Sequence, residues 1–472
     1  MERHTKIEFV KYIYKTINLD NNKKICIIGG GISGLVAAFL LKKKGFEVAL
    51  FEKSGRVGGN IQTVKISDFL IEYAPNSLLK SPRLVDLIEE LSLETEVLAA
   101  SAVNKKRYVL QNGEIKALPM AIAKMATNNY FSLKAKLRLL KEPFVRTKSP
   151  KDESVAGFFE RRLGREIVER AADPFISGIY AGNPENLSVK AAFPRLFELE
   201  RDYGSLFVGS LRSKTEKAPE DFPRTFSFKR GIQALTDKLA EKLDESVRTN
   251  TEISKIEKLA DGKWFVKTDT DEEIFDALII STPAEAAANL IENFDANLSR
   301  QLKSVYYPPV AMIFFGVKRE NITKDLDGFG FLIPGAERRQ TLGTIWNSAV
   351  FENRAPVGYH LLTTFVGGAR NAAIFEKTDE ELFETVYQEL KDILGLQAKP
   401  AFTHIKRWRK AIPQYEIGYE KTEKAIEDFE RKNKGFYFCS NFYKGISVGD
   451  CVKNAYQTAE EISHEQTRKG HE

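Results

Sequence analysis

A glycine-rich turn near the start of the chain constrains the fold more than any other feature. Residues 25–28 form an apolar run, residues 29–34 have the sequence GGGISG, and an alanine- and leucine-rich stretch of helical periodicity follows. A second apolar run, residues 48–51, is followed directly by Glu52. This order predicts a strand–helix–strand unit of a parallel sheet with an acidic residue at the end of its second strand.

The spacing of these glycines predicts a dinucleotide site. Gly29 permits a tight turn, Gly31 lets a pyrophosphate approach the backbone, and Gly34 lets the helix pack against the strand. The start of the helix offers unpaired N–H groups to the phosphates, and Glu52 can accept hydrogen bonds from ribose hydroxyls. A glycine loop that binds nothing would leave Glu52 unexplained. The predicted loop residues are Gly29, Gly31, Ile32, Ser33 and Gly34.

A second glycine-rich element, residues 55–59 (GRVGG), indicates which dinucleotide is bound. Arg56 is a donor suited to a phosphate, although an isolated arginine would equally suit a solvated surface. The arrangement resembles the flavin-binding end of the amine oxidase superfamily, and the second nucleotide fingerprint of NAD-linked reductases is not found. FAD is therefore predicted rather than NAD. The contacts that the resemblance implies in this region are Glu52, Lys53, Arg56, Gly59, Ala74, Pro75, Asn76 and Ser77.

The composition excludes several classes of protein. A chain of 472 residues with 43% hydrophobic residues suggests about three domain-sized units with a sizeable core. No apolar run approaches the roughly 18 residues that span a bilayer, and residues 1–22 lack a secretory signal. Within that extension, residues 9–17 suit either an amphipathic leader or an extra strand. The net charge of +6 is too mild for a nucleic-acid-binding protein.

The number and spacing of cysteines and histidines indicate the cellular compartment and whether a metal site is expected. The three cysteines form no CxxC motif, which indicates a reducing compartment and hence a cytoplasmic protein. The five histidines show no metal-ligand spacing, so no metal site is expected.

The pattern of apolar runs predicts interleaved domains of α/β plus α+β class. The expected parts are an N-terminal extension (1–22), a Rossmann-like FAD-binding domain (23–80, 226–292 and 403–464), a mainly helical region (81–225) and an antiparallel-sheet substrate domain (293–402). In the helical region, residues 131–144 form an amphipathic basic stretch. It suits either a membrane-facing helix or an ordinary surface helix with one core face.

From residue 23 onward the chain resembles the FAD-dependent protoporphyrinogen oxidase family, which includes the bacterial coproporphyrinogen III oxidases. An amine oxidase or a carotenoid desaturase would share the first sixty residues but not the middle blocks. The motifs that carry the resemblance are residues 106–108 (KRY), 142–144 (EPF), 162–164 (RLG), 175–206, 328–334 (GFGFLIP), 342–344 (LGT), 351–356 and 441–451 (NFYKGISVGDC).

The resemblance implies oxidation of protoporphyrinogen IX, coproporphyrinogen III or both to the porphyrin, in haem biosynthesis. It implies three two-electron steps with oxygen as acceptor and hydrogen peroxide as product. The cofactor would carry the redox chemistry, and no catalytic side chain is predicted. The choice between the two substrates, a homodimer and a peripheral contact with the inner face of the cytoplasmic membrane stay open. The alternatives are another enzyme of the superfamily, acting on amines or polyenes, and a flavin-loaded scaffold without turnover.

The resemblance also assigns residues. Arg107 matches an arginine that pairs with a substrate propionate, although a surface arginine on a strand is the plainer interpretation. The segment expected to sandwich the macrocycle comprises Phe329, Gly330 and Leu332, for which core packing is the alternative. The second end of the cofactor site is expected at Ile446, Ser447 and Val448, where a helix dipole would face the flavin. The remaining cofactor contacts implied are Ile253 and Trp408.

Overall fold

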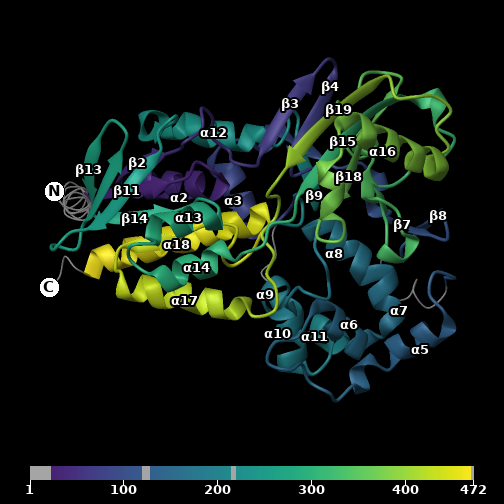
Figure 1. Ribbon diagram of the computed structural model, residues 1–472, viewed down its shortest axis with the longest axis horizontal. Coiled ribbons are helices and arrows are strands. Elements are labelled where there is room, and N and C mark those ends of the chain that lie inside the picture. The colour runs from purple at the N-terminus through teal and green to yellow at the C-terminus, as the bar shows by residue number, and fades with distance from the viewer. Residues whose placement is uncertain (1–22, 120–127, 214–218, 469–472) are drawn as a thin grey trace, which may run out of the picture.

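The computed structural model describes residues 23–119, 128–213 and 219–468. The predictions for residues 1–22 lie outside this part of the chain. Figure 1 shows two lobes side by side, with a parallel sheet and its helices on the left and an antiparallel sheet at the upper right, and a helical region below that second sheet. The described part of the chain begins and ends in the left lobe.

The left lobe is built on a five-stranded parallel sheet of order β10-β2-β1-β14-β20. Nearly every residue of its three central strands is buried, as expected of a parallel sheet covered on both faces. The strands are β1 (Lys24–Ile28), β2 (Glu47–Phe51), β10 (Val247–Arg248), β14 (Ala277–Ile280) and β20 (Phe436–Phe438).

Two apolar cores cover the faces of this sheet. One face packs α2 (Ile32–Lys43), α3 (Pro82–Glu90), α12 (Gln233–Leu243) and α18 (Val448–Arg468). The other packs β11 (Ile253–Lys258), β12 (Trp264–Thr268), β13 (Glu272–Phe275), α13 (Ala284–Ile291), α14 (Ala296–Lys303) and α17 (Tyr419–Lys432).

The right lobe holds a seven-stranded sheet of order β19-β15-β18-β17-β16-β7-β8. All neighbours are antiparallel except β16 and β7. Its strands are β7 (Tyr108–Gln111), β8 (Glu114–Ala117), β15 (Val310–Lys318), β16 (Gly330–Leu332), β17 (Thr341–Ile345), β18 (Tyr359–Gly367) and β19 (Phe402–Trp408). One face packs on α16 (Asp379–Leu394) through a continuous apolar core.

Two small sheets join the lobes. The hairpin of β3 (Gln62–Ile66) and β4 (Phe69–Ala74) packs on β15, and a three-stranded sheet places β9 (Thr225–Phe228) between β5 (Leu78–Leu79) and β6 (Val97–Ala99). Buried Arg354 lies 3.7 Å from Glu72 and donates to Ser227 Oγ at 2.8 Å. This guanidinium therefore ties the right lobe to both small sheets.

The helical region contains α5 (Leu133–Leu140), α6 (Val155–Leu163), α7 (Arg165–Ile167), α8 (Asp173–Tyr180), α9 (Val189–Ala192), α10 (Pro194–Tyr203) and α11 (Leu206–Arg212). Helix α8 packs against β16 and β17 and so connects this region to the seven-stranded sheet. Among the described residues, no helix is long and apolar enough to cross a bilayer.

The predicted domain boundaries need correction at three points. Strand β19 belongs to the seven-stranded sheet because it pairs with β15, so the last flavin-domain segment begins after residue 408. Strands β7 and β8, assigned to the helical region, lie at the other edge of that sheet. Helices α3 and α14 pack on the parallel sheet of the left lobe. In each case a partner distant in sequence decides the placement.

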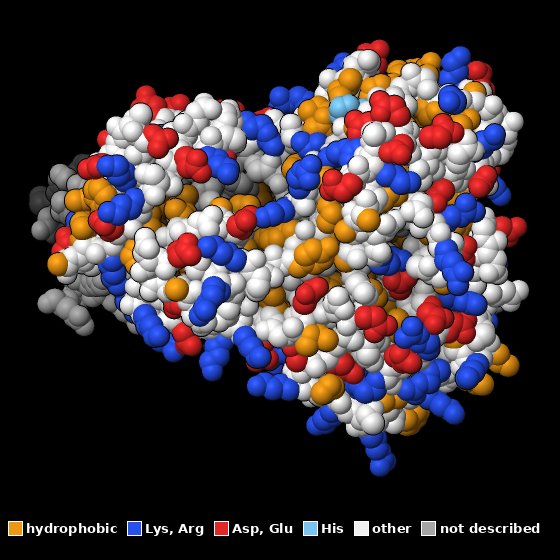
Figure 2. Space-filling model, viewed as in Figure 1, with side chains coloured by type: hydrophobic (Ala, Val, Ile, Leu, Met, Phe, Trp, Pro, Cys, Tyr) orange, Lys and Arg blue, Asp and Glu red, His pale blue; other side chains and the backbone are white. Residues whose placement is uncertain are grey.

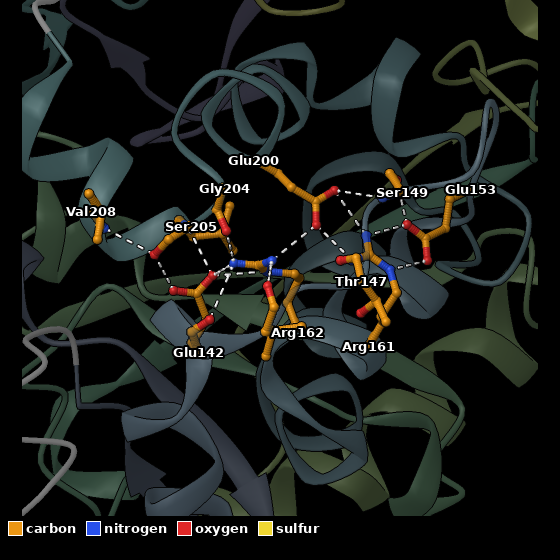
Figure 3. Close-up of polar contacts among 12 residues, drawn as sticks. Glu142, Thr147, Ser149, Glu153, Arg161, Arg162, Glu200, Gly204, Ser205 and Val208 are labelled. Carbon is orange, nitrogen blue, oxygen red and sulfur yellow. Dashed lines mark hydrogen bonds and ion pairs between the residues drawn. The ribbon is translucent and has the colours of Figure 1, made fainter.

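A buried ion-pair network holds the helical region together (Figure 3). Arg162 and Glu142 are fully buried and paired, and Arg162 also contacts Glu200 at 3.2 Å. Glu142 accepts further bonds from Ser205 Oγ at 2.6 Å and from the N–H of Leu206 at 2.9 Å. Burial alone would raise the pKa of Glu142, but these donors together with Arg162 lower it below its usual value.

Replacing Glu142 by Gln should lower the free energy of unfolding by about 3 kcal/mol, because it removes the paired carboxylate of a fully buried guanidinium and leaves it only Glu200, which Arg161 shares. Chemical denaturation of the flavin-loaded protein measures this. The control is Glu169→Gln, which removes an exposed partner of Arg165 and should cost less than about 0.5 kcal/mol. Equal losses for both variants would contradict the network's role.

The same pair sets a pH dependence. Since the folded-state pKa of Glu142 is lowered, its stabilising contribution is complete above the unfolded value of about 4.3 and disappears as the pH falls through the lower folded value. The difference in stability between wild type and Glu142→Gln should therefore shrink on acidification below about pH 4. Denaturation curves measured from pH 7 to pH 3 check this.

Candidate active site

The glycine loop after β1 combines tight packing with one open position. A Cβ at Gly29 would lie 2.8 Å from the carbonyl carbon of Ser281, and one at Gly34 would lie 2.1 Å from Gly29 O. At Gly31, by contrast, a Cβ would meet nothing within 4 Å. Gly29 and Gly34 are thus required by the fold, whereas Gly31 borders open space at the start of α2.

Glu52 is held by this loop and by its own strand end. Its Oε2 accepts from the N–H of Gly30 at 2.8 Å, and its Oε1 accepts from Ser54 N at 2.9 Å and Ser54 Oγ at 2.7 Å. The carboxylate is therefore fixed beside the first glycine loop, where the sequence predicted it.

Arg56 organises the second glycine loop. Its terminal nitrogens donate to the carbonyl oxygens of Val57 at 3.0 Å, Ile61 at 3.3 Å and Gly59 at 2.5 Å. The N–H of Gly58 donates to Gly30 O at 2.7 Å and joins the two loops. The role of Arg56 as a phosphate donor stays a prediction, because in this structure its terminal nitrogens bind the loop itself.

The tail segment comes to the same place from the other end of the chain. Ser447 and Asp450 cap the start of α18 reciprocally, with Asp450 N donating to Ser447 Oγ at 3.1 Å and Ser447 Oγ donating to Asp450 Oδ2 at 2.6 Å. Helix α18 packs along α2, and a contact between Ser33 and Cys451 joins their first turns. The two predicted ends of the cofactor site are thus brought together.

The segment after β4, predicted to contact the cofactor, is connected to the right lobe through Asn76. Asn76 Oδ1 accepts from Asn347 Nδ2 at 2.9 Å, and Asn347 Oδ1 accepts from Thr363 Oγ1 at 2.7 Å. Ala74, Pro75 and Ser77 are half-buried beside Asn76. Two further predicted contacts differ in exposure: Ile253 is buried in β11, and Lys53, just after β2, is exposed.

Register shows which side chains share the face of the seven-stranded sheet that lies opposite α16. Residues paired across neighbouring strands point to the same side. One row runs Lys406, Met312, Phe365, Gly343, Leu332, Val109. Trp408 lies two residues from Lys406 and Arg107 two residues from Val109, so they continue the same face at its two ends. We call this surface the site face.

Arg107 and Phe329, predicted to serve one substrate, are in contact. The guanidinium carbon lies 3.9 Å from the ring centroid of Phe329, and Nη1 donates to Asn104 O at 2.7 Å. Gly330 has φ of +138°, and a Cβ there would lie 2.0 Å from Thr344 O. Strand pairing therefore suffices to explain this glycine.

Several site-face residues were missed by the sequence analysis. Phe365 and Met312 lie between the predicted residues in the row, and Lys406 Nζ lies 4.4 Å from the ring centroid of Trp408. Burial and the positive charge of Arg56 lower the pKa of Lys406. Aromatic and β-branched strands were visible in the sequence, but the pairing register that decides which of their side chains share the site face was not.

The residues present fit a bound dinucleotide. Trp408 Nε1 and Thr282 Oγ1 are buried and have no hydrogen-bond partner among the described residues, and Thr282 lies beside the Gly29 turn. Buried polar atoms normally find partners. Together with the open space at Gly31 and the two adjoining helix starts, these atoms suit a long ligand with phosphates and polar ring edges.

Comparison with known proteins decides the family, because residues 32–463 match the model of flavin containing amine oxidoreductases. The chain belongs to this family. FAD, as predicted from the glycine loops, is its cofactor, and the predicted fold class is confirmed.

The relatives of this flavoprotein include porphyrinogen oxidases. It is 33% identical to the mitochondrial protoporphyrinogen oxidase of Nicotiana tabacum (93% of this chain, 94% of the relative). It is 28% identical to the coproporphyrinogen III oxidase of Bacillus subtilis (92% and 96%). The fold is similar to that of reduced UDP-galactopyranose mutase, with a TM-score of 0.72 at 17% identity and 94% of each chain covered. The predicted resemblance to the porphyrinogen oxidases is thereby confirmed.

Two glycine variants separate a cofactor role from a packing role. Gly31→Ala should leave the apoprotein's free energy of unfolding within about 0.5 kcal/mol of wild type but reduce retained FAD, because the added methyl group enters the open space. Gly34→Ala should destabilise the apoprotein by about 1–3 kcal/mol, because the added Cβ would collide with the carbonyl oxygen of Gly29. Denaturation of the apoprotein and flavin absorbance measure the two effects. Normal FAD retention by Gly31→Ala would contradict the assignment of Gly31 to the cofactor site.

Proposed function

We propose that this flavoenzyme oxidises protoporphyrinogen IX, coproporphyrinogen III or both to the porphyrin, in three two-electron steps of haem biosynthesis. Oxygen is the proposed acceptor and hydrogen peroxide the second product. The observation that carries the proposal is the site face, an apolar surface with a guanidinium at one end and a link to the cofactor loop through Asn347. The names of the relatives point to the same substrate class.

In this proposal the chain binds and orients, and bound FAD supplies the redox chemistry by accepting hydride from the substrate. Gly31, Ile32 and Ser33 receive the pyrophosphate at the start of α2. Glu52 binds the ribose, and the start of α18 at Ser447 stabilises negative charge on the reduced ring. The other proposed holding residues are Gly29, Gly34, Lys53, Arg56, Gly59, Ala74, Pro75, Asn76, Ser77, Ile253, Trp408, Ile446 and Val448.

The substrate lies against the site face. Arg107 pairs with a propionate, and its stacking on Phe329 keeps the guanidinium plane in one orientation before the substrate arrives. Leu332 and Phe365 are partly exposed side chains of this face, and they offer apolar contact to a flat macrocycle. Excluding water from this face strengthens the ion pair with Arg107.

In the direct test, flavin-loaded protein is incubated under air with each of the two porphyrinogens in turn. Porphyrin fluorescence should appear together with hydrogen peroxide. Porphyrin without peroxide would overturn the oxygen acceptor alone. Absence of porphyrin with both substrates, while an amine or a polyene is oxidised, would overturn the proposed substrate class.

Arg107→Gln should lower kcat/KM for the better substrate about 10- to 100-fold, mainly through KM, since a charge-assisted hydrogen bond contributes about 1.5–3 kcal/mol. Arg107→Lys should recover part of the loss because it restores the charge but not the planar fork. Steady-state kinetics compare both with Arg165→Gln, which alters an exposed arginine on α7. A loss for Arg107→Gln no larger than that of the control would refute the assignment.

A peripheral membrane contact through α5 completes the proposal. Leu133, Leu137 and Leu140 are 72%, 51% and 65% exposed, and helical spacing places them on one side of α5. Phe144, in the short turn that follows, is 81% exposed. Ala135 and Leu139 point into the core instead. An exposed apolar stripe among lysines and arginines is typical of a surface that binds an anionic bilayer; Figure 2 shows such mixed side chains at the lower right, over α5.

Phe144→Gln combined with Leu137→Gln should reduce co-sedimentation with phosphatidylglycerol vesicles at least about fivefold, since each substitution removes buried apolar area in the bound state. The control is Leu211→Gln, which alters another exposed leucine, 88% exposed, on α11. Unchanged sedimentation would identify α5 as an ordinary surface helix.

A further inference from the structure

Arg107 lies half-buried without an acidic partner among the described residues. Asn104 accepts from its Nη1 at 2.7 Å through the backbone and at 3.2 Å through the side chain, and Phe329 covers the guanidinium plane at 3.9 Å. A guanidinium carries five N–H donors and a full positive charge. The neutral Asn104 accepts hydrogen bonds from only some of these donors and does not neutralise the positive charge.

A second arginine lies nearby, also without a counter-ion. Burial and the positive charge of Arg224 lower the pKa of Arg107 to about 10, which still leaves Arg107 cationic at neutral pH. The exposed side chain of Arg224 makes no hydrogen bond or ion pair in the part of the chain that the structure describes. Two neighbouring guanidiniums repel each other, and an anion bound by both would remove that cost.

The three-stranded sheet places Arg224 beside the site. The carbonyl oxygen of Arg224 accepts a hydrogen bond from the N–H of Lys80 at 3.0 Å. Lys80 lies four residues after Asn76, in the segment after β4 that is predicted to contact the cofactor. On the other side, Thr225 O accepts from the N–H of Ala100 at 3.0 Å. The short helix η2 (Ala102–Lys105) then leads directly to Arg107. Arg224 is therefore held between the cofactor loop and the segment that carries Arg107.

We propose that Arg224 is a second carboxylate-binding residue, which with Arg107 recognises two neighbouring propionates on one edge of the substrate. This inference rests on the proposed function and names a positioning contact within it. Both porphyrinogens carry propionates on two adjacent rings, so the pair fixes the orientation of the macrocycle on the site face. It does not choose between the two substrates.

The test combines a protein variant with a ligand variant. Flavin-loaded wild type, Arg224→Gln and Arg230→Gln are titrated with protoporphyrin IX, its monomethyl ester and its dimethyl ester. Arg230 is the matched control because it follows the same strand and has only a surface contact, at 3.4 Å, with Glu96. Flavin absorbance and thermal melting establish that each variant is folded.

Wild type and Arg230→Gln should bind the diacid about tenfold more tightly than the monoester, and Arg224→Gln should bind the two within about twofold, as one charge-assisted contact is lost. KM for protoporphyrinogen IX should rise about tenfold in Arg224→Gln, and Arg224→Lys should restore part of the preference. A tenfold diacid preference retained by Arg224→Gln overturns the inference. If wild type neither binds porphyrin nor oxidises porphyrinogen, the proposed function fails with it; if it oxidises porphyrinogen and KM is unchanged in Arg224→Gln, only the inference fails.

Discussion

The close approach of α2 to the turn after β1 is the constraint on which the rest of the molecule depends. A Cβ at Gly34 would lie 2.1 Å from Gly29 O, so only glycine allows the helix to start where it does. Helix α18 packs along α2, and its first turn joins that of α2 through Ser33 and Cys451. Both helix starts therefore lie together, and in the proposed site the positive ends of their dipoles act on one cofactor.

The second requirement is a rigid connection between cofactor and substrate surfaces. Asn347 joins Asn76 of the cofactor loop to Thr363 of β18, and Arg354 reaches from the substrate lobe to Glu72 and Ser227. These contacts are buried, and burial strengthens polar interactions in the low-dielectric interior. Transfer of hydride between two bound groups needs this kind of fixed separation.

The helical region serves the site indirectly. Its ion-pair network around Arg162 is buried with most donors and acceptors satisfied, so it holds α6, α10 and α11 in one arrangement. Helix α8 then places Gly178 against Leu332, where a Cβ would lie 2.5 Å from the leucine Cδ2. The helical region thus supports the edge of the site face that carries Leu332.

The sequence predicted the cofactor half of the proposed site better than the substrate half. The cofactor half was accessible because its information is local: Gly29 to Gly34, Glu52 and residues 55–59 lie within 31 consecutive positions of the chain, and turn geometry demands glycine there. Its second end at Ser447 came from resemblance and coincides with a helix start. The assignments of Arg107, Phe329 and Leu332 also came from resemblance, and Phe365 and Lys406 were missed.

The sequence by itself determined the strand–glycine–helix unit and the dinucleotide class of its cofactor, since both depend on short-range spacing. Only the tertiary structure decided that β19 and β7 join the seven-stranded sheet, that Trp408 and Arg107 share one face of it, and that the charges of Arg224 and Arg107 act on one another. The physical reason is that strand pairing and register are long-range choices. A shift of one residue turns every side chain of a strand to the opposite face, and no local pattern records which partner a strand will take.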